Sequence, residues 1–294
     1  SGSEDSGDDD AATRRSRSRS RSRCALRERH AAALAAYRRN IDPSAQPHGS
    51  CACGLAAESS DLDILGALPL RQILAAARVR SKGFALVEHV AAARVPRCVL
   101  LHRRTKVVVD VIESVKDPNA ALKDDFVRSW LQLRSDIFVP FAREVCMWAR
   151  ANRADLPRED GFPNTFLLLL SAIWFACFRA GLCKVDFGGD TPRWVAGEEP
   201  WLSAADLVDG WLRLLRDGSL QRPVVIDFRS AAGGPPAGRA WAITEPISGR
   251  LVCSLSPEQA AHIASLARAT GCAPNAEPRD CVVSELALDV CARR

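Results

Sequence analysis

Residues 60–64 read Ser-Asp-Leu-Asp-Ile, and residues 107–111 read Val-Val-Val-Asp-Val. Alternate side chains of a β-strand point to the same face, so Asp61 and Asp63 are predicted to project together. Asp110 lies in a β-branched run, where a carboxylate is costly to bury unless it is paired or bound to a metal. An adjacent strand that carries Asp110 to the Asp61 and Asp63 face would bring three carboxylates together.

Three converging carboxylates predict a magnesium site, because Mg²⁺ prefers hard oxygen ligands. Two such ions activate an attacking hydroxyl and stabilise leaving pyrophosphate in an in-line displacement. The pair Gly49-Ser50, with Ser50 11 residues before Asp61, is predicted to offer backbone N–H groups and a hydroxyl to a triphosphate. We therefore expect Asp61, Asp63 and Asp110 to be the catalytic and metal-binding residues, with Mg²⁺ or Mn²⁺ as the cofactor.

Hydrophobic periodicity predicts an α+β protein. Strands are predicted over residues 60–66, 84–90, 97–102, 106–112, 223–228 and 239–244. Helices are predicted over residues 24–39, 69–80, 122–133, 136–152, 164–180, 203–217 and 256–270. Because most strands precede residue 113 and most helices follow it, the pattern indicates a mixed region followed by a mostly helical one.

The composition of the 294 residues is that of a globular protein, with 47% hydrophobic and 26% charged residues. The longest nearly unbroken apolar run, 166–178, falls short of the roughly 20 residues that span a bilayer, so no membrane partner is expected. The net charge of +5 does not by itself indicate a nucleic-acid binder. An odd count of 11 cysteines without a regular spacing indicates a reducing compartment, so we expect an intracellular protein. Nucleus and cytoplasm are both open, and so is an organelle, because the sequence does not begin with Met.

Residues 1–23 are of low complexity, with an acidic cluster followed by an Arg-Ser repeat over 15–23. Such a segment has little to bury and is expected to be disordered. Arg-Ser tracts bind RNA or other Arg-Ser segments, and contacts of this kind are one prediction for the tail. A solvated tail without a specific partner is the equal alternative.

At this point the sequence resembles the DNA polymerase β-like nucleotidyltransferases, in particular their RNA-tailing branch of cytoplasmic-type poly(A) polymerases and terminal uridylyltransferases. The Gly-Ser pair, the Asp-x-Asp and the third Asp carry the resemblance, which extends over about residues 30–270. Further matching segments are Ala-Ala-Arg-Val-Pro at 92–96, Val-Cys-Met-Trp-Ala-Arg at 145–150, Gly-Phe-Pro-Asn-Thr-Phe at 161–166, 202–215 and Ile-Thr-Glu-Pro at 243–246.

The resemblance implies a nucleotidyltransferase palm, a mixed sheet with helices, joined to a mostly helical PAP-associated domain. The expected division is a tail over 1–23, the palm with its leading helix over 24–115, the helical domain over 116–270 and a C-terminal tail over 271–294. The implied reaction is template-independent addition of AMP or UMP from ATP or UTP to an RNA 3′ end, with release of pyrophosphate.

The resemblance also implies nucleotide contacts outside the palm. Phe166 corresponds to the aromatic residue that stacks on the incoming base, and Asn164 and Thr165 would face the nucleotide. Arg150 corresponds to one of two basic residues that touch the triphosphate, whereas the other position is Cys146. With Gly49 and Ser50, these are the predicted nucleotide-binding residues.

Three further positions depart from the family pattern. Asp124 and Asp125 fall where the family has an Asn-Ser/Thr pair, and His48 stands where an aromatic is usual. Leu251 lies nearest the place of a base-reading histidine, and its absence favours ATP. The departures leave a catalytically inactive RNA-binding or scaffolding relative as the alternative function. A nucleotidyltransferase acting on a small molecule or a protein is a third candidate, disfavoured by the downstream helical resemblance.

Thiols near the Gly-Ser pair raise the question of zinc. His48, Cys51 and Cys53 are close in sequence, but a structural zinc site needs about four ligands and no second Cys/His pair lies nearby. We therefore interpret this stretch as a tight loop with incidental thiols.

Overall fold

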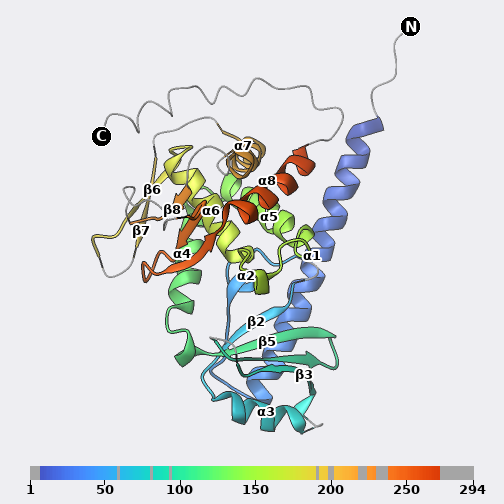
Figure 1. Ribbon diagram of the computed structural model, residues 1–294. Helices are drawn as coiled ribbons and strands as arrows, with labels where there is room; N and C mark the ends of the chain where they lie inside the picture. The colour runs from blue at the N-terminus through green and yellow to red at the C-terminus, as the bar shows by residue number, and fades with distance from the viewer. Residues whose placement is uncertain are drawn as a thin grey trace. The chain divides into compact units, whose positions relative to one another are not determined.

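The structure, a computed structural model, describes residues 7–57, 60–79, 82–92, 95–189, 192–197, 202–217, 224–229 and 238–271. Three predicted features lie outside these ranges: the first six residues, Ala93-Arg94 of the Ala-Arg-Val-Pro segment, and the C-terminal tail from residue 272. The chain divides into two units, Ser1–Asp124 and Asp125–Arg294 (Figure 1). The predicted boundary, 115/116, falls nine residues earlier.

The first unit is built on a five-stranded sheet with the order β1-β2-β5-β4-β3. Its strands are β1 (Gln46–Pro47), β2 (Leu62–Gly66), β3 (Phe84–Val90), β4 (Arg97–His102) and β5 (Val107–Glu113). Its helices are α1 (Gly7–Asn40), α2 (Gly49–Ala52) and α3 (Leu70–Arg78), and α4 (Ala120–Leu133) begins in this unit. The β2–β5 pair is parallel and the other pairs are antiparallel, so the sheet is mixed as predicted.

One face of the sheet is buried under α1 and α3 (Figure 1). Tyr37 of α1 and Ile73 of α3 are fully buried against it, and the ring of Tyr37 meets Phe84 edge-on at 5.7 Å. The residues that β2 and β5 contribute to this core are Leu62, Ile64, Val107, Val109 and Val111. Because strand side chains alternate, the residues between them belong to the opposite face.

The second unit combines helices with two small sheets. Its helices are α5 (Ser135–Ala151), α6 (Thr165–Phe178), α7 (Ala204–Asp217) and α8 (Pro257–Gly271). Its strands are β6 (Cys183–Asp186), β7 (Arg193–Ala196), β8 (Val224–Ile226), β9 (Trp241–Thr244) and β10 (Leu251–Leu255). Large aromatic side chains fill its interior: Trp130 stacks on Phe138 at 4.4 Å, and Trp211 is fully buried with Nε1 donating to Ser171 Oγ at 2.9 Å.

Most predicted helices and strands are present, and the differences have local causes. The structure continues α1 back to Gly7, so it differs from the expected disorder over residues 7–23. Arginine has a high intrinsic helix propensity, and serine lowers it only moderately, so the repeat can extend a helix that is already formed at 24–40. The sequence analysis missed β1, β6, β7 and β10, which are short and alternate too few residues to give a clear period. In the part of the chain that the structure describes, no helix is both long and apolar enough to traverse a lipid bilayer.

Candidate active site

The acidic residues singled out in the sequence belong to the two parallel central strands. Asp63 of β2 is the register partner of Asp110 of β5. Neighbours in register point to the same face, and this face is opposite the one that holds Ile64 and Val111 in the core. Asp61 lies immediately before β2, two residues from Asp63, and is exposed. The structure thus places the carboxylates of Asp63 and Asp110 side by side and Asp61 next to them.

The neighbouring charges also affect the pKa of Asp63. The pKa of Asp63 is raised from its ordinary 3.8 to about 7, first by burial and then by the negative charge of Asp110, with Asp61 and Asp124 adding to it. His48 acts in the opposite direction. The negative charges of Asp110, Asp61 and Asp124 make the ionisation of Asp63 harder, and a bound cation would relieve this repulsion.

The donor chemistry at this face fits a divalent cation such as Mg²⁺, because it consists of carboxylate oxygens that repel one another. Room is provided by Gly49, since a Cβ at this position would lie 2.9 Å from Asp63 Oδ2. However, no group of three or more His, Cys, Asp or Glu side chains among the described residues is arranged to hold a metal ion. One of these carboxylates, Asp110, is also engaged by an arginine.

Arg97, the first residue of β4, donates from Nη1 to Asp110 Oδ2 and lies 3.7 Å from Glu88. Strand register explains the contact, because Val99 is the direct partner of Asp110 and Arg97 is two residues away on the same face. The sequence analysis missed Arg97, since only the pairing of β4 with β5 reveals that it reaches the third carboxylate. A cation that binds Asp110 through Oδ2 would therefore compete with the Arg97 guanidinium.

The Gly49-Ser50 pair begins α2, a single turn with Gly49 at φ +62°, a conformation that favours glycine. The Gly49 amide donates to both carboxylate oxygens of the buried Asp124, at 3.1 and 3.2 Å. It is therefore satisfied within the protein, which differs from the expectation that it is offered directly to a triphosphate. Asp124 can take this role because both oxygens of its carboxylate accept hydrogen bonds.

Asp124 also holds His48, whose Nδ1 lies 2.6 Å from Asp124 Oδ2. Burial opposes the charged imidazolium, but the hydrogen bond and charge of Asp124, with the charges of Asp63 and Asp117, raise the pKa of His48 overall. When protonated, His48 partly offsets the charge of these acids. The sequence showed His48 and Asp124 only as departures from a pattern, because no local spacing links residues 76 positions apart.

The other predicted nucleotide contacts lie in the second unit. Arg150 is near the end of α5, and among the described residues its buried Nη1 has no hydrogen-bond partner. Cys146, one turn earlier, is 3% exposed, and burial raises the pKa of its thiol to about 11, so this position supplies no charge. Asn164 is the N-cap of α6, where its Oδ1 accepts from the Leu167 amide at 2.9 Å. Thr165 and Phe166 follow in the first turn, both partly exposed.

No protein-family profile and no curated protein sequence matches the chain significantly. Its backbone is similar to that of Cid1 poly(U) polymerase, with a TM-score of 0.67 at 17% identity, covering 86% of this chain and 89% of that one. The chain therefore shares the fold of this polymerase. A Cid1 structure with MgGTP bound gives a TM-score of 0.64 at 16% identity, covering 90% and 92% of the two chains. A cytoplasmic RNA terminal U-transferase gives 0.62 at 18% identity, covering 83% and 86%.

These similarities confirm the predicted fold class, a mixed helix and sheet nucleotidyltransferase fold. At such low identity they establish the arrangement of the backbone alone. The chemistry has to be argued from the side chains, and Asp61, Asp63 and Asp110 are the groups that make such an argument possible.

Proposed function

We propose that the protein is a template-independent RNA 3′-terminal nucleotidyltransferase, which adds AMP or UMP from a nucleoside triphosphate and releases pyrophosphate. One observation carries the proposal: the in-register pairing of Asp63 with Asp110, next to Asp61, on a fold shared with RNA terminal uridylyltransferases. The resemblance in the sequence and the similarity of the backbone point to the same reaction independently of each other.

In this mechanism Asp61 and Asp63 would hold two divalent cations, and Asp110 would hold the catalytic one. When bound, these cations neutralise the triphosphate and lower the barrier to in-line attack. The RNA 3′-oxygen forms a bond to the α-phosphorus, the bond from that phosphorus to the β-phosphate bridging oxygen breaks, and pyrophosphate leaves. Asp110, once Arg97 has released it, accepts the proton of the 3′-hydroxyl.

The remaining contacts follow from the chemistry of individual side chains. Ser50 offers its hydroxyl to the β- and γ-phosphates, and His48, whose pKa is raised, adds positive charge beside it when protonated. Arg150 has a buried guanidinium nitrogen without a partner among the described residues, which is the kind of donor that a phosphate oxygen satisfies. Phe166 is partly exposed at the start of α6 and stacks on no other ring in the described part of the chain, so its face is available to a base.

The nucleotide is ATP or UTP. The similar structures include Cid1 poly(U) polymerase with a UTP analogue, which supports UTP, whereas the absence of the base-reading histidine near Leu251 supports ATP. Leu251 begins β10 and is 49% exposed, so its side chain is not committed to the core. Mg²⁺ is the proposed cofactor, with Mn²⁺ as its substitute in the assay.

The proposal extends to the wider setting of the chain. The helices after Asp125 correspond to a PAP-associated domain in this assignment, and the Arg-Ser segment would contact RNA or other Arg-Ser proteins. An intracellular compartment agrees with the thiols, since none of the eight cysteines within the described ranges forms a disulfide. The cytoplasm is the first choice, because one similar protein is a cytoplasmic RNA terminal U-transferase.

The test is a tailing assay with purified protein, an end-labelled oligoadenylate, Mg²⁺ or Mn²⁺, and each nucleoside triphosphate separately. Extension with ATP or UTP that disappears in Asp61→Ala, and persists in the charge-matched surface control Asp209→Asn, supports the proposal. Asp209 is suited to this role because its one ion pair within the described residues is a half-exposed i,i+4 contact with Arg213 on α7. No extension with any nucleotide, together with retained RNA binding, would favour the inactive scaffold instead.

A further inference from the structure

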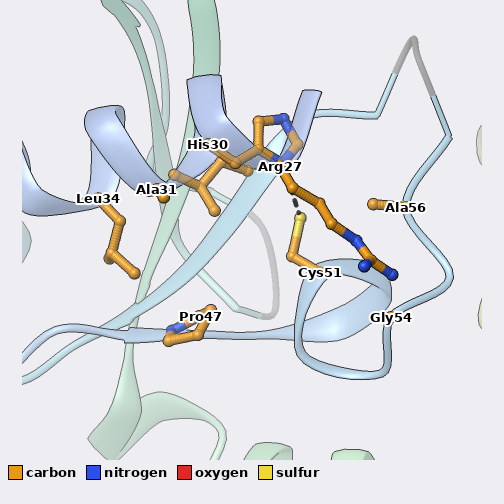
Figure 2. Close-up of a pocket in the computed structure, with 9 residues that line it drawn as sticks. Arg27, His30, Ala31, Leu34, Pro47, Cys51, Gly54 and Ala56 are labelled. Atoms are coloured by element: carbon orange, nitrogen blue, oxygen red, sulfur yellow. Dashed lines mark hydrogen bonds between the residues drawn. The ribbon is translucent and has the colours of Figure 1, made fainter. Parts of the chain in front are cut away.

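A small pocket of about 170 Å³ lies in the first unit, beside the α2 turn (Figure 2). Helix α1 contributes Arg27, His30 and Leu34 to its wall, and Cys51 of α2 closes another side. Pro47 and Leu62 complete a lining that is mostly apolar, with a thiol, an imidazole and a guanidinium as its polar groups. None of these groups has a role in the nucleotidyl transfer described above.

Cys51 and His30 form a thiol–imidazole pair within this pocket. Cys51 Sγ lies 3.3 Å from His30 Nδ1, and Figure 2 shows this contact as a dashed line. The other ring nitrogen, His30 Nε2, lies 3.1 Å from the carbonyl oxygen of Ser60. Because a carbonyl only accepts, Nε2 carries the proton, and Nδ1 is left as the basic nitrogen that faces the thiol. This is the arrangement of an activated nucleophile: a thiol, a base, and a third group that orients the base.

The surroundings keep the imidazole in its neutral, proton-accepting form. His30 is 8% exposed, and burial, helped by the charge of Arg29, lowers its pKa in spite of the bond to Ser60 and the charge of Asp61. Cys51 is only partly buried and lines an accessible pocket, so a small reagent can reach its sulfur. In contrast, five other described cysteines are buried: Cys98, Cys146, Cys177, Cys183 and Cys253.

We propose that Cys51 is a nucleophilic thiol, activated by His30, that reacts with hydroperoxides and thereby switches the neighbouring site off. The mostly apolar pocket can admit a small uncharged oxidant. The coupling to the site is direct: Cys51 follows Ser50 on α2, and its thiol also donates to the carbonyl oxygen of Asp61 at 3.4 Å, so this carbonyl and His30 Nδ1 share the thiol hydrogen. The switching of the neighbouring site rests on the proposed function, whereas the reactivity of the thiol does not.

The chemistry balances with hydrogen peroxide as the only co-reactant. His30 Nδ1 takes the thiol proton, and the thiolate of Cys51 attacks one peroxide oxygen as the O–O bond breaks. The departing hydroxide takes the proton from the imidazolium, so that Cys–SH and H₂O₂ give Cys–SOH and H₂O. Sulfur is oxidised by two electrons and peroxide oxygen is reduced. The added oxygen occupies the space between Cys51 and His30 and breaks the contact with Asp61 that steadies the entry to β2.

The experiment follows sulfenic acid formation at each cysteine of the full chain, by dimedone trapping and peptide mass spectrometry during treatment with hydrogen peroxide. Cys24, exposed on α1, is the internal reference thiol. We expect Cys51 to react at least tenfold faster than Cys24. In His30→Gln, whose amide nitrogen can still donate to Ser60 but which lacks the basic nitrogen, the rate at Cys51 should fall to within threefold of the reference.

Equal rates at Cys51 and Cys24 in the unaltered protein would overturn the proposal, and so would an unchanged Cys51 rate in a folded His30→Gln. Peroxide is expected to lower tailing by the unaltered protein at least tenfold but to spare Cys51→Ser. An equal loss in both proteins would refute the switch while leaving the thiol chemistry standing. If the reduced protein shows no tailing at all, the proposed function fails, and the dimedone rates still decide the reactivity of Cys51.

Discussion

Replacing Asp63 by asparagine should stabilise the protein while destroying its proposed activity. Asp63 is ionised only at a cost, because burial and the adjacent Asp110 raise its pKa from 3.8 to about 7. Asparagine has nearly the same shape and no charge to ionise. The variant therefore removes a repulsion that the native protein tolerates for the sake of cation binding.

The size of the effect follows from the shift in pKa. Between about pH 4 and pH 7 the folded state retains a proton that the unfolded state has lost, so ionisation of Asp63 lowers the stability of the folded state progressively across this window. At about 1.4 kcal/mol per unit, the full penalty is ~4 kcal/mol above pH 7. At pH 5 only about 2 kcal/mol has accumulated, since the unfolded carboxyl is ionised only from its ordinary pKa upward. Asp63→Asn should gain these amounts relative to the native chain.

The assay is urea unfolding at pH 5 and pH 8 in the presence of EDTA. Asp42→Asn is the matched control, because Asp42 is also buried but its carboxylate accepts hydrogen bonds from Ser44, Ala67 and Leu68. Burial alone would raise the pKa of Asp42, yet these bonds lower it overall. Asp42→Asn should therefore destabilise the protein at pH 8, and the loss should shrink as the pH falls below about 4.

The reasoning is refuted if Asp63→Asn is no more stable than the native protein at pH 8, or if its gain is the same at both pH values. Either result would mean that burial and the charge of Asp110 do not raise the pKa of Asp63 in the folded protein. Mg²⁺ should stabilise the native protein but not Asp63→Asn, so adding it should abolish the stability advantage of the variant. That result would agree with the account.

Three further predictions concern single contacts of the site. Gly49→Ala should lose about 1–2 kcal/mol in urea unfolding, because its φ is +62° and the new Cβ would meet Asp63 Oδ2 at 2.9 Å; unchanged stability would contradict the turn geometry. Arg97→Gln should lower the Mg²⁺ concentration for half-maximal tailing about fivefold, since ~1 kcal/mol of ion pairing with the partly exposed Asp110 no longer competes; a rise would show that Arg97 assists cation binding. Asn164→Ala should lower the free energy of unfolding by about 1 kcal/mol through loss of the α6 cap. An unchanged free energy of unfolding would show that Asn164 does not stabilise the helix.

Much of the fold could be predicted from the sequence because its periodicities are strong. The β-branched run at 107–111 and the alternation at 60–66 predicted the two central strands, and Asp61, Asp63 and Asp110 followed from them. The order and register of the strands could not be predicted in this way, because they depend on the whole sheet. The pairing of β4 with β5, and hence the contact of Arg97 with Asp110, was therefore outside the reach of local patterns.

Contacts between distant segments account for the rest of what was missed. The pair His48–Asp124 and the pair His30–Cys51 join residues 76 and 21 positions apart, and single histidines in a sequence carry no sign of such partners. Asn164 is an example of the opposite kind. The resemblance suggested that it contacts the nucleotide, and the structure shows it as the N-cap of α6. Asparagine is preferred at this position on physical grounds alone, because its side chain accepts a backbone hydrogen bond.

The central claim is that Asp61, Asp63 and Asp110 bind divalent cations together, and direct measurement of Mn²⁺ binding tests it. Electron paramagnetic resonance of free Mn²⁺, titrated with the full chain, gives the affinity without reliance on turnover. The account predicts saturable binding that weakens at least tenfold in Asp61→Asn and in Asp110→Asn and is unchanged in Asp209→Asn. Binding that is unaffected by Asp110→Asn would contradict it, since the third carboxylate would then have no part in the site.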